Sequence, residues 1–82
     1  MMTDYKPIPC IDYSLLEEAI VLRRALRLGW HDDDGQDHVE TVQPADLRTR
    51  NGEEFLIFLR KDGDRREVRL DRIVGFEPVA GA

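Results

Sequence analysis

The sequence predicts a small, mainly β domain in which one N-terminal helix precedes a strongly bent antiparallel sheet of about five strands. Three observations carry this prediction. The chain has 82 residues, so dividing it would leave parts too small to bury a core, and residues 1–82 are expected to form one domain. A single helical pattern occurs, near the N-terminus. Five short apolar segments follow it, separated by residues typical of tight turns.

An extended lead-in over residues 1–11 is expected before the helix. Pro7 and Pro9 fix their own backbone and disfavour helical geometry in the residue before each, so the chain through Ile8 should stay extended. The chain's one cysteine, Cys10, cannot form an internal disulfide. A nucleophilic cysteine needs a neighbouring base, and the neighbours here are apolar. We therefore interpret Cys10 as a packed structural residue.

A helix is predicted over about residues 13–25. Ser14 and Glu17 fit a capping box, and Asp12 is an alternative cap that the sequence does not separate from it. Acids in the first turns and arginines in the last turn suit the helix dipole. At about 100° per residue, four apolar residues cluster on the side expected to be buried: Leu15, Leu16, Ala19 and Leu22.

The rest of the ordered chain, about residues 26–77, is expected to form strands. The apolar segments lie at residues 26–30, 38–42, 55–59, 67–70 and 73–76. Asn51-Gly52 is a strong hairpin signal, and Pro44 is expected to interrupt or bend its strand because proline cannot donate to the ladder. The tail over 78–82 is expected to be frayed.

Strands of this length with tight turns favour closure into a small barrel of the SH3-like or Sm-like type. Closing the sheet hides its edges, which stabilises a domain of this size. An open α+β sandwich is the alternative fold.

The charge distribution limits the classes of partner. The formal net charge is −5, and nucleic-acid binding needs a surplus of lysine and arginine, so no direct nucleic-acid contact is expected. Residues 1–40 hold nine acids and four bases, whereas residues 41–82 hold eight of each. A cationic partner would therefore be steered to the first half of the chain.

The sequence also predicts where the protein works. No apolar run approaches the roughly 20 residues of a membrane span, and the N-terminus lacks the features of a secretory signal. We expect a cytoplasmic protein with no membrane partner and no cofactor, monomeric when free.

The segment 31–38 is the clearest candidate for a metal site, because it holds two histidines and four acids. The calcium-loop pattern fails, since Trp30 stands where the first aspartate ligand belongs, and a second ligand pair for zinc is missing. We interpret the segment as an acidic, solvated turn and assign Trp30 to core or rim packing. No catalytic triad or phosphate-binding glycine loop is recognisable, so the protein is not expected to be an enzyme.

A basic strip follows later in the chain, formed by Arg65, Arg66, Arg69 and Arg72. Asp64, Glu67 and Asp71 interleave with these arginines, which favours a charge-balanced face. An Sm-like RNA-binding module that uses this strip is the alternative function.

Two motifs resemble the Rof (YaeO) family, small bacterial inhibitors of the transcription termination factor Rho. The opening motif is Tyr5-x-Pro7-Ile8-x-Cys10-x-Asp12-Tyr13, followed by Leu16-Glu17. The closing motif is Arg66-Glu67-x-Arg69-Leu70-Asp71-x-Ile73-x-x-Phe76. The resemblance covers roughly residues 5–77.

This resemblance implies an Sm-like barrel with an N-terminal helix. It also implies an acidic protein that binds the N-terminal RNA-binding region of Rho, blocks RNA loading and so causes antitermination. The family's acidic binding surface matches Asp12, Tyr13 and Glu17 here. Ser14 stands where the enterobacterial protein has an acid, and Glu18 is a candidate to replace that charge. The predicted partner-binding residues are therefore Asp12, Tyr13, Glu17 and Glu18.

Overall fold

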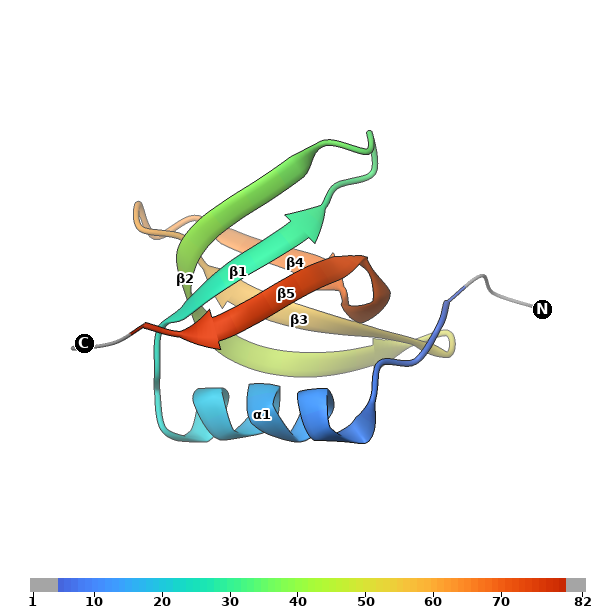
Figure 1. Cartoon of the computed structure of the whole chain (residues 1–82), viewed down its shortest axis with the longest axis horizontal. Coiled ribbons are helices and arrows are strands. Elements are labelled where there is room, and N and C mark those ends of the chain that lie inside the picture. Colours follow the sequence, from blue (N-terminus) through green and yellow to red (C-terminus); the bar gives the residue numbers. More distant parts are fainter. Residues whose placement is uncertain (1–4, 80–82) are drawn as a thin grey trace.

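The computed structural model describes residues 5–79 and confirms the predicted fold class, one helix followed by a five-stranded antiparallel sheet (Figure 1). The elements in chain order are helix α1 (Cys10–Val21), strands β1 (Leu26–His31), β2 (Asp37–Arg50), β3 (Glu53–Leu59) and β4 (Arg65–Arg69), the single 3-10 turn η1 (Leu70–Arg72) and strand β5 (Ile73–Pro78). Within residues 5–79 no helix is long and apolar enough to cross a bilayer.

The sheet is organised around its longest strand, β2. The strand order is β4-β3-β2-β1-β5, and β2 pairs with β1 through its first half and with β3 through its second half. The register shifts between Pro44 and Asp46, where a bulge bends the strand, as Figure 1 shows in the curved course of β2. Pro44 bends β2 without ending it, because the strand continues to Arg50. The expected bend is thus confirmed.

The bend makes the sheet barrel-like and leaves it open along one side. In the described chain β4 pairs only with β3, and β5 pairs only with β1, so these two strands are the ends of the sheet. The hairpin predicted at Asn51-Gly52 is confirmed. Both residues have positive φ angles, 51° and 78°, which the tight turn between β2 and β3 requires.

Helix α1 begins earlier than predicted, at Cys10, which is exposed and not packed. The N-cap is Pro9, whose carbonyl accepts hydrogen bonds from the N–H groups of Asp12 at 3.0 Å and Tyr13 at 3.1 Å. The predicted caps at Asp12 and Ser14 are therefore wrong, since both residues already lie inside the helix. A backbone carbonyl held by the extended proline serves as the cap, and no side chain is needed.

The helix also ends earlier than predicted, at Val21, because the chain turns sharply after it. Arg23 adopts a left-handed φ of 55°, and its N–H donates to the carbonyl of Ile20 at 3.2 Å. The N–H of Arg24 donates to the carbonyl of Ala19 at 2.9 Å. This pair of bonds is the Schellman arrangement that closes a helix, here with arginine in the position usually held by glycine.

The core lies between α1 and the concave face of the sheet. The helix contributes Leu16, which is 0% exposed, and Ala19, while Leu15 is 44% and Leu22 51% exposed. The prediction that Leu15 and Leu22 are buried is wrong. The sheet and η1 supply the rest of the core cluster: Leu26, Leu28, Trp30, Val42, Leu56, Phe58, Val68 and Leu70.

The ends of the chain are described only in part. Residues 1–4 of the predicted lead-in and residues 80–82 of the predicted tail lie outside the described residues. Pro78 belongs to β5, and the N–H of Val79 donates to the carbonyl of Ala25 at 3.2 Å. The start predicted for the frayed tail, residue 78, is therefore too early.

Two neighbouring leucines of α1 test this packing. We expect Leu16→Ala to lower the free energy of unfolding by about 2–5 kcal/mol, because it leaves a cavity in the core. Leu15→Ala removes the same atoms from a half-exposed position and should cost less than about 1 kcal/mol. Urea denaturation of both variants checks this, and equal costs would contradict the assigned helix face.

Candidate ligand-binding cleft

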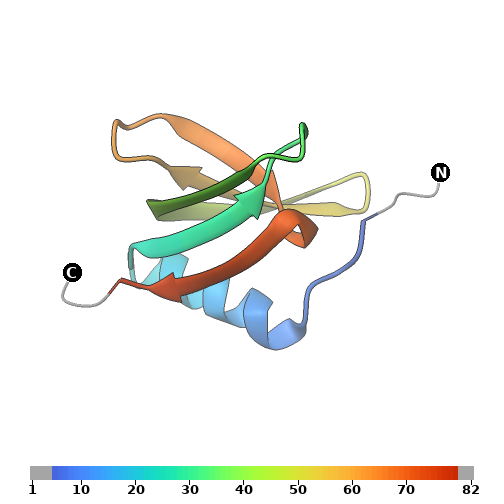
Figure 2. The same cartoon turned by 45° about the horizontal axis from the view of Figure 1, so that its top comes forward.

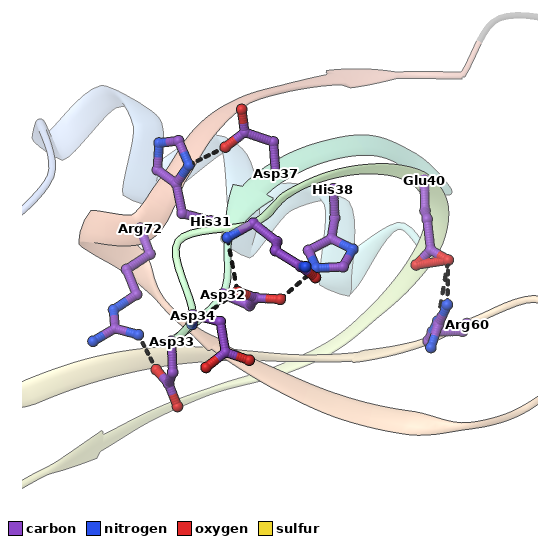
Figure 3. Close-up of polar contacts among 10 residues, drawn as sticks. His31, Asp32, Asp33, Asp34, Asp37, His38, Glu40, Arg60 and Arg72 are labelled. Atoms are coloured by element: carbon purple, nitrogen blue, oxygen red, sulfur yellow. Dashed lines mark hydrogen bonds and ion pairs between the residues drawn. The ribbon is translucent and has the colours of Figure 1, made fainter.

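The loop between β1 and β2 is built around the carboxylate of Asp32 (Figure 3). Its Oδ1 accepts hydrogen bonds from the backbone N–H groups of Asp34 at 2.9 Å and Gln36 at 3.0 Å. Its Oδ2 lies 2.7 Å from Nε2 of His38. The hydrogen bond from His38 and these backbone donors hold the pKa of Asp32 below its usual range. The loop is therefore ordered by its own side chains.

Two further ion pairs fix the edges of this loop. His31 contacts Asp37 across the base of the hairpin, and Asp33 contacts Arg72 of η1. The second contact joins residues 39 positions apart in the chain. Among residues 5–79, no group of three or more His, Cys, Asp or Glu side chains is placed to hold a metal ion.

A cleft of about 430 Å³ lies between this loop and the β3–β4 part of the sheet. Three aromatic side chains contribute to its lining, Trp30, Phe55 and Phe58. The Trp30 ring meets Phe58 edge to face, with centroids 5.3 Å apart, and stacks on the His38 ring at 5.0 Å. Phe55 lines the same cleft. Trp30 is buried in the core cluster, so its predicted role in packing is confirmed, and it also lines the cleft.

Arg69 is the most buried arginine at the cleft, with a side chain that is 13% exposed. It contacts Glu53 at 3.1 Å and makes two hydrogen bonds to Asp71, at 2.6 and 3.0 Å. Its charge is balanced by two carboxylates, and its planar group joins β4 to β3 and to η1. We assign Arg69 a structural role.

Arg66 and Arg72 are the more accessible cations of the cleft. Arg66 contacts Asp64 at 2.6 Å, and Arg72 contacts Asp33, which is itself almost fully exposed. The pairing of Arg66 with Asp64 and of Arg69 with Asp71 confirms the predicted charge-balanced face. An exposed ion pair is weak, so a ligand anion can replace Asp33 at low cost.

The predicted partner-binding residues lie elsewhere, on α1, at the opposite end of the molecule from the β1–β2 loop (Figure 1). Glu17 and Glu18 are exposed, and Asp12 is half-buried. Tyr13 packs against the core, and burial together with the nearby Glu54 raises its pKa. The structure therefore separates these residues from the cleft, and their role in binding stays a prediction.

The WYL domain family model matches residues 12–78. Proteasome accessory factor B/C (PafBC) of Arthrobacter aurescens has a similar structure, with a TM-score of 0.79 and 21% identity. The match covers 98% of this chain and 13% of that one, so this chain spans a small part of PafBC. No curated protein matches the chain.

These matches overturn the resemblance to the Rof family. The predictions that depended on it, Rho as the partner and antitermination as the function, are wrong. The expectation of no direct nucleic-acid contact, which was based on the net charge, is also contradicted, because the matching family includes regulators that work with nucleic acid. The Sm-like label and the RNA-binding module built on it also find no support. The opening and closing motifs were too short to identify a family.

The loop predicts a pH-dependent stability. The pKa of Asp32 is lowered in the folded state. Its ionised carboxylate therefore stabilises the fold at neutral pH, and this stabilisation is lost as the pH falls through the lowered pKa. We expect Asp32→Asn to lower the melting temperature at pH 7, and the difference from wild type to shrink in acid. Asp34→Asn, in the same turn, is the control. A constant difference from pH 7 to pH 2, measured by calorimetry, would contradict this account.

Proposed function

This chain belongs to the WYL domain family, and we propose that it is a ligand-binding regulatory domain of a transcription regulator. WYL domains are found in PafBC-type transcription regulators that bind ligands or DNA. We further propose that the domain works in the cytoplasm and that its role is binding, not catalysis.

The observation that carries this proposal is the cleft between the β1–β2 loop and β4. Its volume of about 430 Å³ lies in the range of small-molecule sites, roughly 300–1,000 Å³. Aromatic side chains, Trp30 and Phe55 among them, line it together with arginines. As a whole its lining is mixed, since four apolar side chains lie beside three arginines and four carboxylates.

The lining favours a small ligand that carries both a ring and an anionic group. A ring can pack on the aromatic side chains, while a carboxylate or phosphate can bind the planar guanidinium of Arg72 through paired hydrogen bonds. Three arginines and four carboxylates line the cleft, so an anionic group binds there only where it contacts the arginines directly.

Binding of such a ligand can be followed through Trp30, the chain's one tryptophan. We expect phenyl phosphate to change Trp30 fluorescence in a saturable way. Benzyl alcohol carries only the ring and inorganic phosphate only the anion, so each should bind at least about tenfold more weakly. Arg72→Gln should weaken phenyl phosphate binding by a similar factor.

The matched control is Arg24→Gln, which removes an exposed arginine after α1 and should leave binding unchanged. No saturable change with any of the three compounds would argue against an anionic aromatic ligand. An equal loss in both arginine variants would show that the probe responds to net charge and not to the cleft.

Asp33 is expected to compete with the ligand anion for Arg72, because it already contacts that arginine. Asp33→Asn removes that competitor and should tighten phenyl phosphate binding several-fold, as measured by calorimetric titration. Asp34→Asn changes the same charge one residue away and should have a smaller effect. If the two variants bind alike, the Asp33–Arg72 pair does not control access to the site.

A further inference from the structure

The segment before α1, residues 5–9, is tied to the sheet, and we call it the strap. Figures 1 and 2 show it leaving the start of α1 and passing beside the hairpin between β2 and β3. The Tyr5 hydroxyl donates to Oε1 of Glu54 in β3 at 3.3 Å. The backbone N–H of Lys6 donates to Oδ2 of Asp71 in η1 at 3.2 Å. These bonds join residues 49 and 65 positions apart, so tertiary contacts hold the strap in place.

Tyr5 is the main side-chain anchor of the strap. Burial and the neighbouring Glu54 raise the pKa of Tyr5 to about 12, so its phenol keeps the proton at neutral pH and can donate to that carboxylate. The guanidinium of Arg69 lies 5.8 Å from the centroid of the Tyr5 ring, a cation–π contact. The ring also packs against the core cluster, as does Ile8.

The strap and the cleft meet at the ion pair between Arg69 and Asp71. The Asp71 carboxylate accepts hydrogen bonds from Arg69 at 2.6 and 3.0 Å and from the N–H of Lys6. The two side chains are 13% and 12% exposed, so either charge would be costly to leave unpaired. On its other side Arg69 contacts Glu53, and both of these residues line the cleft. One buried ion pair therefore connects the strap to the cleft wall.

The turn η1 makes a second connection. It is three residues long: Asp71, in the middle, binds the strap, and Arg72, at the end, lines the cleft. Leu70, the first residue, is 0% exposed and anchors the turn in the core. Because Asp71 and Arg72 are consecutive in one short turn, a backbone placement that suits the contact of one also positions the other.

We propose that the strap regulates the cleft: docking of the strap and binding of an anionic ligand stabilise the same placement of η1, so each strengthens the other. This inference rests on the ligand site proposed above. The coupling is positive because the docked strap fixes Asp71 and so reduces the freedom that the ligand must remove at Arg72. By thermodynamic linkage, the docked strap tightens ligand binding by the same factor as the bound ligand tightens strap docking.

Phenyl phosphate and the whole chain test both directions of this coupling. Tyr5→Ala removes the ring and the hydroxyl that anchor the strap, and should weaken phenyl phosphate binding by about fivefold, the lower end of the usual range for coupled sites. Tyr5→Phe keeps the ring beside Arg69 and should weaken binding by about twofold at most. In the wild type, saturating phenyl phosphate should slow the solvent exchange of the Lys6 amide, measured by NMR, by about the same fivefold.

The matched control is Ile20→Ala, since Ile20 also packs against the core cluster but lies near the end of α1, away from the strap. Thermal melting verifies that each variant is folded, and this one should keep the wild-type affinity. Equal losses in Tyr5→Ala and Ile20→Ala would overturn the coupling. So would unchanged Lys6 exchange while Trp30 fluorescence shows a saturated cleft, a result that leaves the ligand site standing. Absence of any saturable Trp30 change would instead overturn the ligand site, and the coupling with it.

Discussion

The bend of β2 at Pro44–Asp46 is the constraint on which the other features of this domain depend. Because the strand changes direction there, its first half carries the β1–β2 hairpin and its second half carries β3 and β4. The two halves form facing walls, and α1 covers the apolar space between them. A straight β2 would give a flat sheet with no cleft. The bulge supplies the curvature at the cost of a local break in the ladder.

The bend also brings together residues that no local pattern connects. Trp30 is the second-last residue of β1, and Arg72 lies in η1 before the last strand, yet both line one cleft. Sequence reasoning found each of them and gave them separate roles, because their proximity follows only from the strand order. The charges divide in a similar way. Carboxylates near the cleft are held in ion pairs, whereas Glu17 and Glu18 of α1 are exposed without such partners in the described residues.

Features that depend on a few neighbouring residues were predictable from the sequence. Asn51-Gly52 requires a tight hairpin, and Pro44 cannot continue a ladder unchanged, so both were located correctly. The buried face of α1 was not predictable, because the helix is apolar on both sides and periodicity does not distinguish Leu15 from Leu16. The helix start was missed because the carbonyl of Pro9 forms the cap, which leaves no side-chain signature.

The central claim is that the bent sheet forms one ligand cleft between the β1–β2 loop and the β3–β4 part of the sheet, with Arg72 of η1 in its lining. A two-dimensional ¹H–¹⁵N NMR titration with phenyl phosphate tests it most directly. The account predicts that the indole N–H of Trp30 and the backbone amide of Arg72 shift together, with one binding constant, while amides of α1 stay in place. Shifts that are confined to α1, or that leave Trp30 unchanged as the ligand saturates, would contradict it.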